Sequence, residues 1–167
     1  MPTAFTKGDI FETTGIQAYG FGGSTDGSMD VGIASAMKKR WPELAVAYAE
    51  HCQGGKFALG DVFVWTNGEV TVFALGIQNA DGKPRLSALH TALRKMLQAA
   101  PAAKIKRIGL PRIGTGPVSL DWTRVRKMLG EITVGSTVRI DVFEQFIRTA
   151  KPATPANADE SAAAATE

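Results

Sequence analysis

The sequence contains one cysteine, two histidines and no long apolar run, and each shortage excludes a class of protein. Cys52 has no second cysteine with which to form an internal disulfide or a cysteine-based zinc cluster. With His51 and His90 as the only histidines, we expect no metal site. No run of the roughly 18 to 20 apolar residues that a membrane span needs is present, and the first residues lack a signal-peptide core. We therefore expect a cytoplasmic protein that uses no cofactor and no membrane; a monomer is assumed, since the sequence does not indicate the oligomeric state.

Charge is modest and unevenly distributed along the chain. The net charge is +3, and residues 151–167 hold one lysine against three acidic residues, which leaves +5 on residues 1–150. A mildly basic body suits an anionic small molecule. No dense stripe of Lys and Arg with interleaved aromatic residues is present, so nucleic acid is not the expected partner.

Composition divides the chain into one domain, residues 1–149, and a tail, residues 150–167. The tail is rich in alanine and proline and lacks large apolar residues, so it cannot offset its ordering entropy and we expect it to be disordered. In the domain, strand-like and helix-like periods alternate, which predicts a mixed α/β sandwich around a central sheet. The expected strands lie within 3–12 and at 15–19, 61–65, 70–75, 105–110 and 137–143. The expected helices lie at 31–40, from 42 onward, at 84–100 and at 121–130.

Two glycine-rich segments follow strand-like runs and precede helices. Residues 111–116, Pro-Arg-Ile-Gly-Thr-Gly, follow one apolar strand, and residues 20–27, Gly-Phe-Gly-Gly-Ser-Thr-Asp-Gly, follow another. Glycine lets a ligand approach the backbone closely, and free amides at a helix start favour phosphate. The alternative is a pair of ordinary turns. Because the carboxyl ends of strands collect ligands in such sheets, the two segments together predict a diphosphate between them.

Four polar or aromatic side chains are candidates for ligand contacts, and each has a simpler structural interpretation. Asp9 could accept a hydrogen bond from an exocyclic amine, or it could serve as a turn residue. Phe143 could stack on a base, or it could fill the core. Asp26 could contact a ribose or act as a general base, or it could bond to its own backbone. Arg112 could pair with phosphate or with a surface carboxylate. No Gly-Lys-Ser/Thr follows either glycine segment, which argues against a kinase or an ATPase.

Three motifs, taken in order, resemble the macro domain family. They are Gly8-Asp9-Ile10-Phe11, then residues 24–34 with Lys38-Lys39-Arg40-Trp41-Pro42, then residues 110–116 with Leu120-Asp121-Trp122. The resemblance spans residues 5–145 and is closest to the branch that includes the terminal ADP-ribose glycohydrolase. It implies a three-layer α/β/α fold with a cleft for ADP-ribose.

The resemblance also implies a role for each matched position. Asp9 would hold the adenine amine beside the Ile10 backbone, and Phe143 would pack on adenine. The segment 24–34 would wrap the distal ribose and a phosphate, through Ser24, Thr25, Gly32 and Ile33. The second glycine segment would close over the diphosphate, through Pro111, Arg112, Ile113, Gly114, Thr115 and Gly116.

Departures from the family pattern affect the expected activity. Asp30 replaces a glycine in the first segment. The glycohydrolase branch uses a lysine where this chain has Ile77 or Gln78, and an aspartate where it has Val118. We therefore expect a protein that binds ADP-ribose, either free or as part of an ADP-ribosylated protein. The alternative is an ADP-ribosyl hydrolase or ADP-ribose-1″-phosphate phosphatase in which Asp26 or Asp30 assists as a general base.

Overall fold

The computed structural model describes residues 3–114 and 118–146. The predicted contacts of Thr115 and Gly116, the boundary at residue 149 and the tail lie outside the described residues. The strands are β1 (Thr3–Gly8), β2 (Ala18–Ser24), β3 (Val62–Thr66), β4 (Thr71–Gln78), β5 (Arg107–Pro111) and β6 (Arg139–Phe146). The helices are α1 (Gly32–Arg40), α2 (Pro42–Cys52), the short 3-10 turn η1 (Gln53–Gly55), α3 (Leu86–Ala102) and α4 (Trp122–Ile132).

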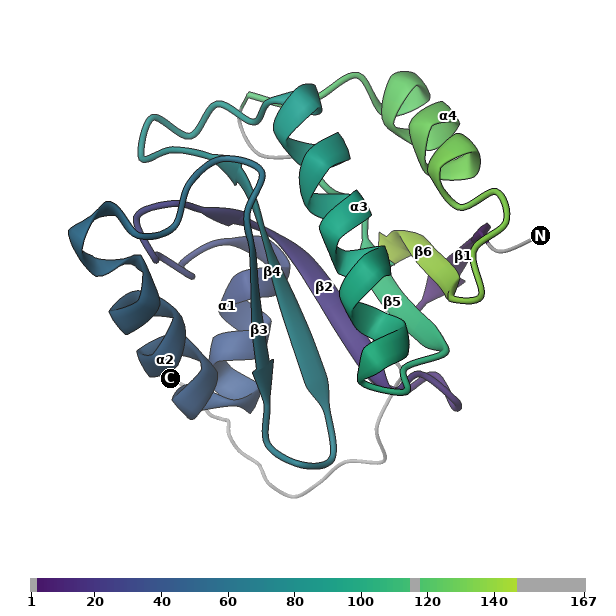
Figure 1. Cartoon of the computed structure of the whole chain (residues 1–167), viewed down its shortest axis with the longest axis horizontal. Coiled ribbons are helices and arrows are strands. Elements are labelled where there is room, and N and C mark those ends of the chain that lie inside the picture. The colour runs from purple at the N-terminus through teal and green to yellow at the C-terminus, as the bar shows by residue number, and fades with distance from the viewer. Residues whose placement is uncertain (1–2, 115–117, 147–167) are drawn as a thin grey trace, which may run out of the picture.

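The strands form one mixed six-stranded sheet in the order β1-β6-β5-β2-β4-β3. Every neighbouring pair is parallel except β3 and β4, which are antiparallel. Residues 67–70 make the turn of that antiparallel pair and begin with Asn67-Gly68, a dipeptide typical of hairpins. The β1 strand joins the sheet beside β6, so the first and last strands of the chain lie side by side (Figure 1).

Helices cover both faces of the sheet and give two separate apolar cores (Figure 1). One core packs α3 and α4 against the sheet, and the other packs α1 and α2 against the opposite face. Successive side chains of a strand point to opposite faces of the sheet. In β4, Phe73 and Leu75 therefore belong to the first core, whereas Val72 and Ala74 belong to the second. This architecture confirms the predicted α/β class with three layers and a central mixed sheet.

The predicted loop at residues 20–27 is mostly strand, and this prediction is wrong for its first half. Gly20, Gly22 and Gly23 lie within β2. Each is glycine because a side chain lacks room there: a Cβ on Gly20 would lie 2.5 Å from Leu110 Cδ2, and one on Gly22 would lie 2.6 Å from Ile77 Cδ1. The glycines therefore serve close packing in the middle of the sheet. The turn itself begins at Thr25.

Candidate functional site

The candidate site lies at the edge of the sheet where the five parallel strands end. Strands β1, β6, β5, β2 and β4 all run in the same direction, so the segments that follow β1, β2 and β5 emerge at one edge. Strand β2 itself lies beside the segment after β5, since a Cβ on Gly22 would lie 3.0 Å from Ile113 Cγ2. The two glycine segments thus reach the same edge although about 90 residues of chain separate them.

Hydrogen bonds from the end of β4 hold the segment after β2. The Thr25 amide donates to the Gln78 carbonyl at 2.9 Å, and the Thr25 hydroxyl donates to Asn79 Oδ1 at 2.7 Å. The Gly27 amide then donates back to the Ser24 carbonyl at 3.2 Å. Ser24 is buried. The segment is therefore a short fixed turn that leads from β2 toward α1.

Asp26 bonds to its own turn. Its Oδ1 accepts the Ser28 amide at 2.9 Å, and the Ser24 hydroxyl lies 3.4 Å from the Asp26 amide. Partial burial raises the pKa of Asp26, but hydrogen bonds from the Ser28 amide and from the Ser28 and Ser24 hydroxyls outweigh it, so the pKa lies below its usual range. The carboxylate is ionised at neutral pH and is a weaker base than a free aspartate.

The start of α1 follows this turn and carries the second predicted acid. Asp30 is exposed and pairs with Lys38 Nζ at 3.5 Å. Val31 precedes α1 without a side-chain cap, and Gly32 has φ +60° in open space, where a Cβ would meet nothing within 4 Å. Ile33 is half-buried. A helix start without a side-chain cap presents backbone amides that favour an anion.

The turn after β1 contributes Asp9 and Ile10, and β6 contributes Phe143, which lies within the strand and not at its end. Asp9 Oδ1 accepts the Phe11 amide at 2.9 Å, which is the turn role considered for it. Ile10 and Phe143 belong to the same buried core, and Phe143 is 4% exposed. A Cβ on Gly8 would lie 3.9 Å from Phe143 Cε2. In this structure the Phe143 ring is chiefly a core residue below the Asp9 turn.

The segment after β5 begins with one exposed cation and one sharp turn. Pro111 ends β5, and the Arg112 guanidinium lies over the Trp122 ring with 5.0 Å to its centroid. Ile113 is buried. Gly114 has φ +78°, and its carbonyl accepts the Leu120 amide at 2.8 Å. Arg112 therefore stacks on the first turn of α4 at this edge.

Sequence reasoning missed three contributors to this edge. Tyr48 of α2 donates its hydroxyl to the Ser24 carbonyl. Asn79 accepts from Thr25, as described above. Trp122 donates from Nε1 to Glu144 Oε2 at 2.7 Å, which orients the ring under Arg112. For Tyr48 the signal was present, because a hydroxyl on an otherwise apolar helix face needs a buried partner.

The resemblance to the glycohydrolase branch implies a lysine at Ile77 or Gln78 and an aspartate at Val118, but this chain has uncharged residues at these positions. Ile77 is 2% exposed and belongs to the core under α3. Gln78 is half-buried at the end of β4, and Val118 is exposed. Neither a cation nor a carboxylate stands at these places. Among the described residues, no group of three or more His, Cys, Asp and Glu side chains could hold a metal ion.

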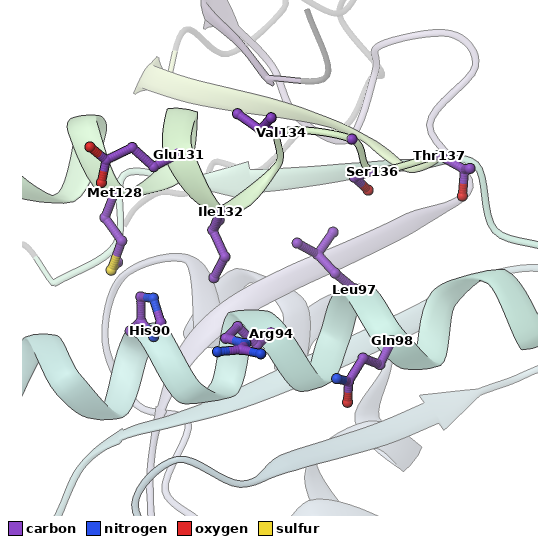
Figure 2. Close-up of a pocket in the computed structure, with 11 residues that line it drawn as sticks. His90, Arg94, Leu97, Gln98, Met128, Glu131, Ile132, Val134, Ser136 and Thr137 are labelled. Atoms are coloured by element: carbon purple, nitrogen blue, oxygen red, sulfur yellow. The ribbon is translucent and has the colours of Figure 1, made fainter.

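A cavity of about 590 Å³ lies away from this edge, between α3 and α4 (Figure 2). Its lining includes Arg94 and Gln98 on α3, Ile132 on α4, and Thr137 just before β6. Thr137 precedes the amino end of a parallel strand, so the cavity reaches toward the opposite edge of the sheet. None of the predicted site residues lines it. In the part of the chain that is described, no helix is long and apolar enough to cross a membrane.

Comparison with known proteins gives a family and a set of distant relatives. The Macro domain model matches residues 24–129. DNA ADP-ribosyl glycohydrolase of Thermus aquaticus is 24% identical over 132 residues, which cover 76% of this chain and 36% of that protein. ADP-ribose glycohydrolase OARD1 of Homo sapiens is 24% identical over 139 residues, which cover 83% of this chain and 89% of that protein. The chain thus spans about a third of the length of the first relative but most of the second.

Solved structures share the fold at low sequence identity. The macrodomain of Mycobacterium tuberculosis DarG superposes with a TM-score of 0.78 at 22% identity, covering 84% of this chain and 96% of that one. A structure described as Thermosipho africanus DarTG in complex with ADP-ribose gives 0.75 at 16% identity, covering 87% and 41%. The predicted resemblance is confirmed: the chain belongs to the macro domain family.

Proposed function

We propose that this protein binds ADP-ribose, free or attached to a macromolecule, at the carboxyl edge of its parallel strands. The observation that carries the proposal is the meeting of three segments at this edge: the Asp9 turn, the Thr25–Val31 turn with the uncapped start of α1, and the segment from Arg112. The family match and the ADP-ribose complex of a protein with the same fold support it.

The segments suit different parts of the ligand. Asp9 and the Ile10 backbone would hold the adenine amine, with Phe143 packing below. Ser24, Thr25, Gly32 and Ile33 would contact the distal ribose and one phosphate. The phosphate would lie at Gly32 and Ile33, because their amides belong to the uncapped start of α1. The segment 111–116 would cover the diphosphate, and Arg112 would supply positive charge.

Calorimetry with ADP-ribose tests the proposal through Asp9. Replacing Asp9 with Ala should weaken binding by about 1 to 3 kcal/mol, because a buried donor on the ligand loses its acceptor. Since Asp9 also accepts the Phe11 amide, Asp9→Asn is the second variant: it retains an acceptor for the turn but not the charge, and should also bind more weakly.

Glu69→Ala, which changes a carboxylate in the turn between β3 and β4, is the control and should bind as the wild type does. Equal affinity of all four proteins would show that Asp9 is a turn residue only. No measurable heat from the wild type at millimolar ADP-ribose would overturn the proposed function.

Hydrolysis is the second candidate function, and the names of the two curated relatives favour it. Where the glycohydrolase branch has a lysine, this chain has either Ile77, which is buried, or Gln78, which is half-buried. Where that branch has an aspartate, this chain has Val118. A reaction would then depend on water activated by Asp26 or Asp30. Of the two, Asp26 already bonds to its own turn.

A turnover assay separates binding from hydrolysis. The substrates are ADP-ribosylated protein, ADP-ribosylated DNA and ADP-ribose-1″-phosphate, and the proteins are wild type, Asp26→Ala and Asp30→Ala. We expect no release above background from any of them. Release by the wild type that disappears in a variant with normal ADP-ribose affinity would establish hydrolysis and identify the base.

A further inference from the structure

Tyr48 is a fully buried residue of α2 whose ring is fixed on several sides. It meets the Phe21 ring edge-on at 5.7 Å and the Phe57 ring edge-on at 5.6 Å. The Phe63 ring lies 5.7 Å away in a tilted arrangement. Packing of this kind leaves the phenol one position, so the hydroxyl is held at a defined point beneath the end of β2.

The hydroxyl donates to the backbone carbonyl of Ser24. The same carbonyl accepts the Gly27 amide at 3.2 Å, which closes the turn. One oxygen at the end of β2 therefore links the core of α2 to the turn that leads into α1. Burial, together with the nearby Cys52 and Asp26, raises the pKa of the Tyr48 phenol well above its ordinary value, so the hydroxyl stays a neutral donor at physiological pH.

Two glycines make this link sterically feasible. A Cβ on Gly23 would lie 2.5 Å from the Tyr48 hydroxyl oxygen, so only glycine leaves room for it there. Gly27 has φ +84°, and a Cβ there would lie 3.0 Å from Ala49 Cα and 3.2 Å from Cys52 Cβ. The turn rests directly on α2, and both glycines serve that contact.

We propose that Tyr48 is a positioning residue for the ligand: through the Ser24 carbonyl, its hydroxyl fixes the Ser24–Gly27 turn in the arrangement that receives the distal ribose and phosphate of ADP-ribose. The inference rests on the proposed function. Its physical basis is preorganisation, because a turn that is already ordered loses less entropy when the ligand binds. The adenine end, formed by the Asp9 turn, does not depend on this link.

The test compares Tyr48→Phe with Tyr19→Phe, since these are the two tyrosines of the chain and both are buried. Each variant loses one hydroxyl and retains its ring. Calorimetry should show that Tyr48→Phe binds ADP-ribose about 2- to 13-fold more weakly, the effect of one lost hydrogen bond. The affinity for AMP, which lacks the distal ribose, should change less than twofold. The Tyr19 hydroxyl interacts with Asp9 of the adenine end, so any effect of Tyr19→Phe should be equal for ADP-ribose and AMP.

Amide hydrogen exchange on the unliganded proteins gives a second readout that needs no ligand. The amides of residues 25–28 should exchange at least about tenfold faster in Tyr48→Phe than in the wild type or Tyr19→Phe, because one anchor of the turn is removed. Exchange in the middle of β4 should stay unchanged. A role limited to overall stability would instead accelerate exchange throughout the core.

If Tyr48→Phe does not fold, Gly23→Ala is the second variant, since its added methyl displaces the same hydroxyl; it should show the same selective loss of ADP-ribose affinity. Unchanged ADP-ribose affinity in a folded Tyr48→Phe, or an equal loss for ADP-ribose and AMP, would overturn the inference. Failure of the wild type to bind ADP-ribose would overturn the proposed function instead, and the exchange of residues 25–28 would then decide whether Tyr48 anchors the turn.

Discussion

At the scale of single residues, glycines of the sheet and glycines of the helices have different structural reasons. Gly76 lies in β4, where a Cβ would come 2.7 Å from the Ala58 carbonyl oxygen. Gly130 lies in α4, where a Cβ would meet nothing within 4 Å. The two positions predict opposite effects of the same substitution.

Gly76→Ala should lower the free energy of unfolding by about 1 to 3 kcal/mol, because the methyl meets backbone that must shift. Gly130→Ala should raise it by about 0.5 to 1 kcal/mol, because alanine has less conformational freedom to lose in a helix. Urea denaturation of both variants and the wild type measures the difference. A stable Gly76→Ala would mean that the segment around Ala58 moves readily.

At the scale of elements, α4 closes the segment that follows β5. The helix begins after Asp121, whose Oδ1 accepts the Thr123 amide at 3.0 Å, the hydrogen bond of an N-cap residue. The Leu120 amide, one residue earlier, bonds to the Gly114 carbonyl. The N-cap residue Asp121 therefore directly follows Leu120, the residue that is hydrogen-bonded to the turn at Gly114.

Asp121→Ala should lower the free energy of unfolding by about 1 kcal/mol, the usual effect of losing an N-cap. Asp121→Asn is the matched variant and should stay within about 0.5 kcal/mol of the wild type, because asparagine caps as well as aspartate does. Chemical denaturation of the three proteins decides this. Equal losses in both variants would point to the charge of Asp121 rather than to its hydrogen bond.

At the scale of the whole molecule, ion pairs tie the helices to the sheet from outside the two cores. Asp61, next to β3, accepts the Ala58 amide at 2.9 Å and pairs with Lys95 of α3 at 3.0 Å. The Ala58 hydrogen bond is the largest influence and lowers the pKa of Asp61; burial opposes it, and Lys95 lowers it further. A carboxylate with a lowered pKa stabilises the folded state above its unfolded pKa.

Acid should therefore weaken the fold, and part of that loss should depend on Asp61. This contribution is fully present at neutral pH and disappears as the pH falls below about 4, through the folded pKa. At pH 7, Asp61→Asn should be less stable than the wild type by about 0.5 to 1 kcal/mol, the scale of a partly exposed pair. Urea midpoints measured between pH 7 and pH 3 should converge. A constant difference across that range would contradict the argument.

The periodicity of apolar residues predicts most of the helices and strands. Residue types and short motifs predict fewer of the contacts at the candidate site. The amphipathic pattern of residues 84–100 and the Asn-Gly turn at 67–68 identify α3 and the β3–β4 hairpin closely. The glycines of β2 were mistaken for a loop because their cause is a neighbour distant in sequence, such as Leu110 against Gly20. Similarly, no local pattern shows that the Tyr48 hydroxyl finds the Ser24 carbonyl. Contacts of this kind are set by tertiary packing.

The parallel pairing of β1 with β6 has a consequence for how the protein is made. Thr3 lies opposite Ile140 and Gly8 opposite Phe146. Strand β1 therefore cannot pair until β6, more than 130 residues later in the sequence, has been synthesised. During translation the first strand leaves the ribosome long before its partner exists, and such distant pairing forms slowly. A nascent chain that has not yet released β6 has neither a neighbour for β1 nor Phe143 beneath the Asp9 turn. The apolar packing beneath the Asp9 turn is therefore complete only after β6 has been synthesised.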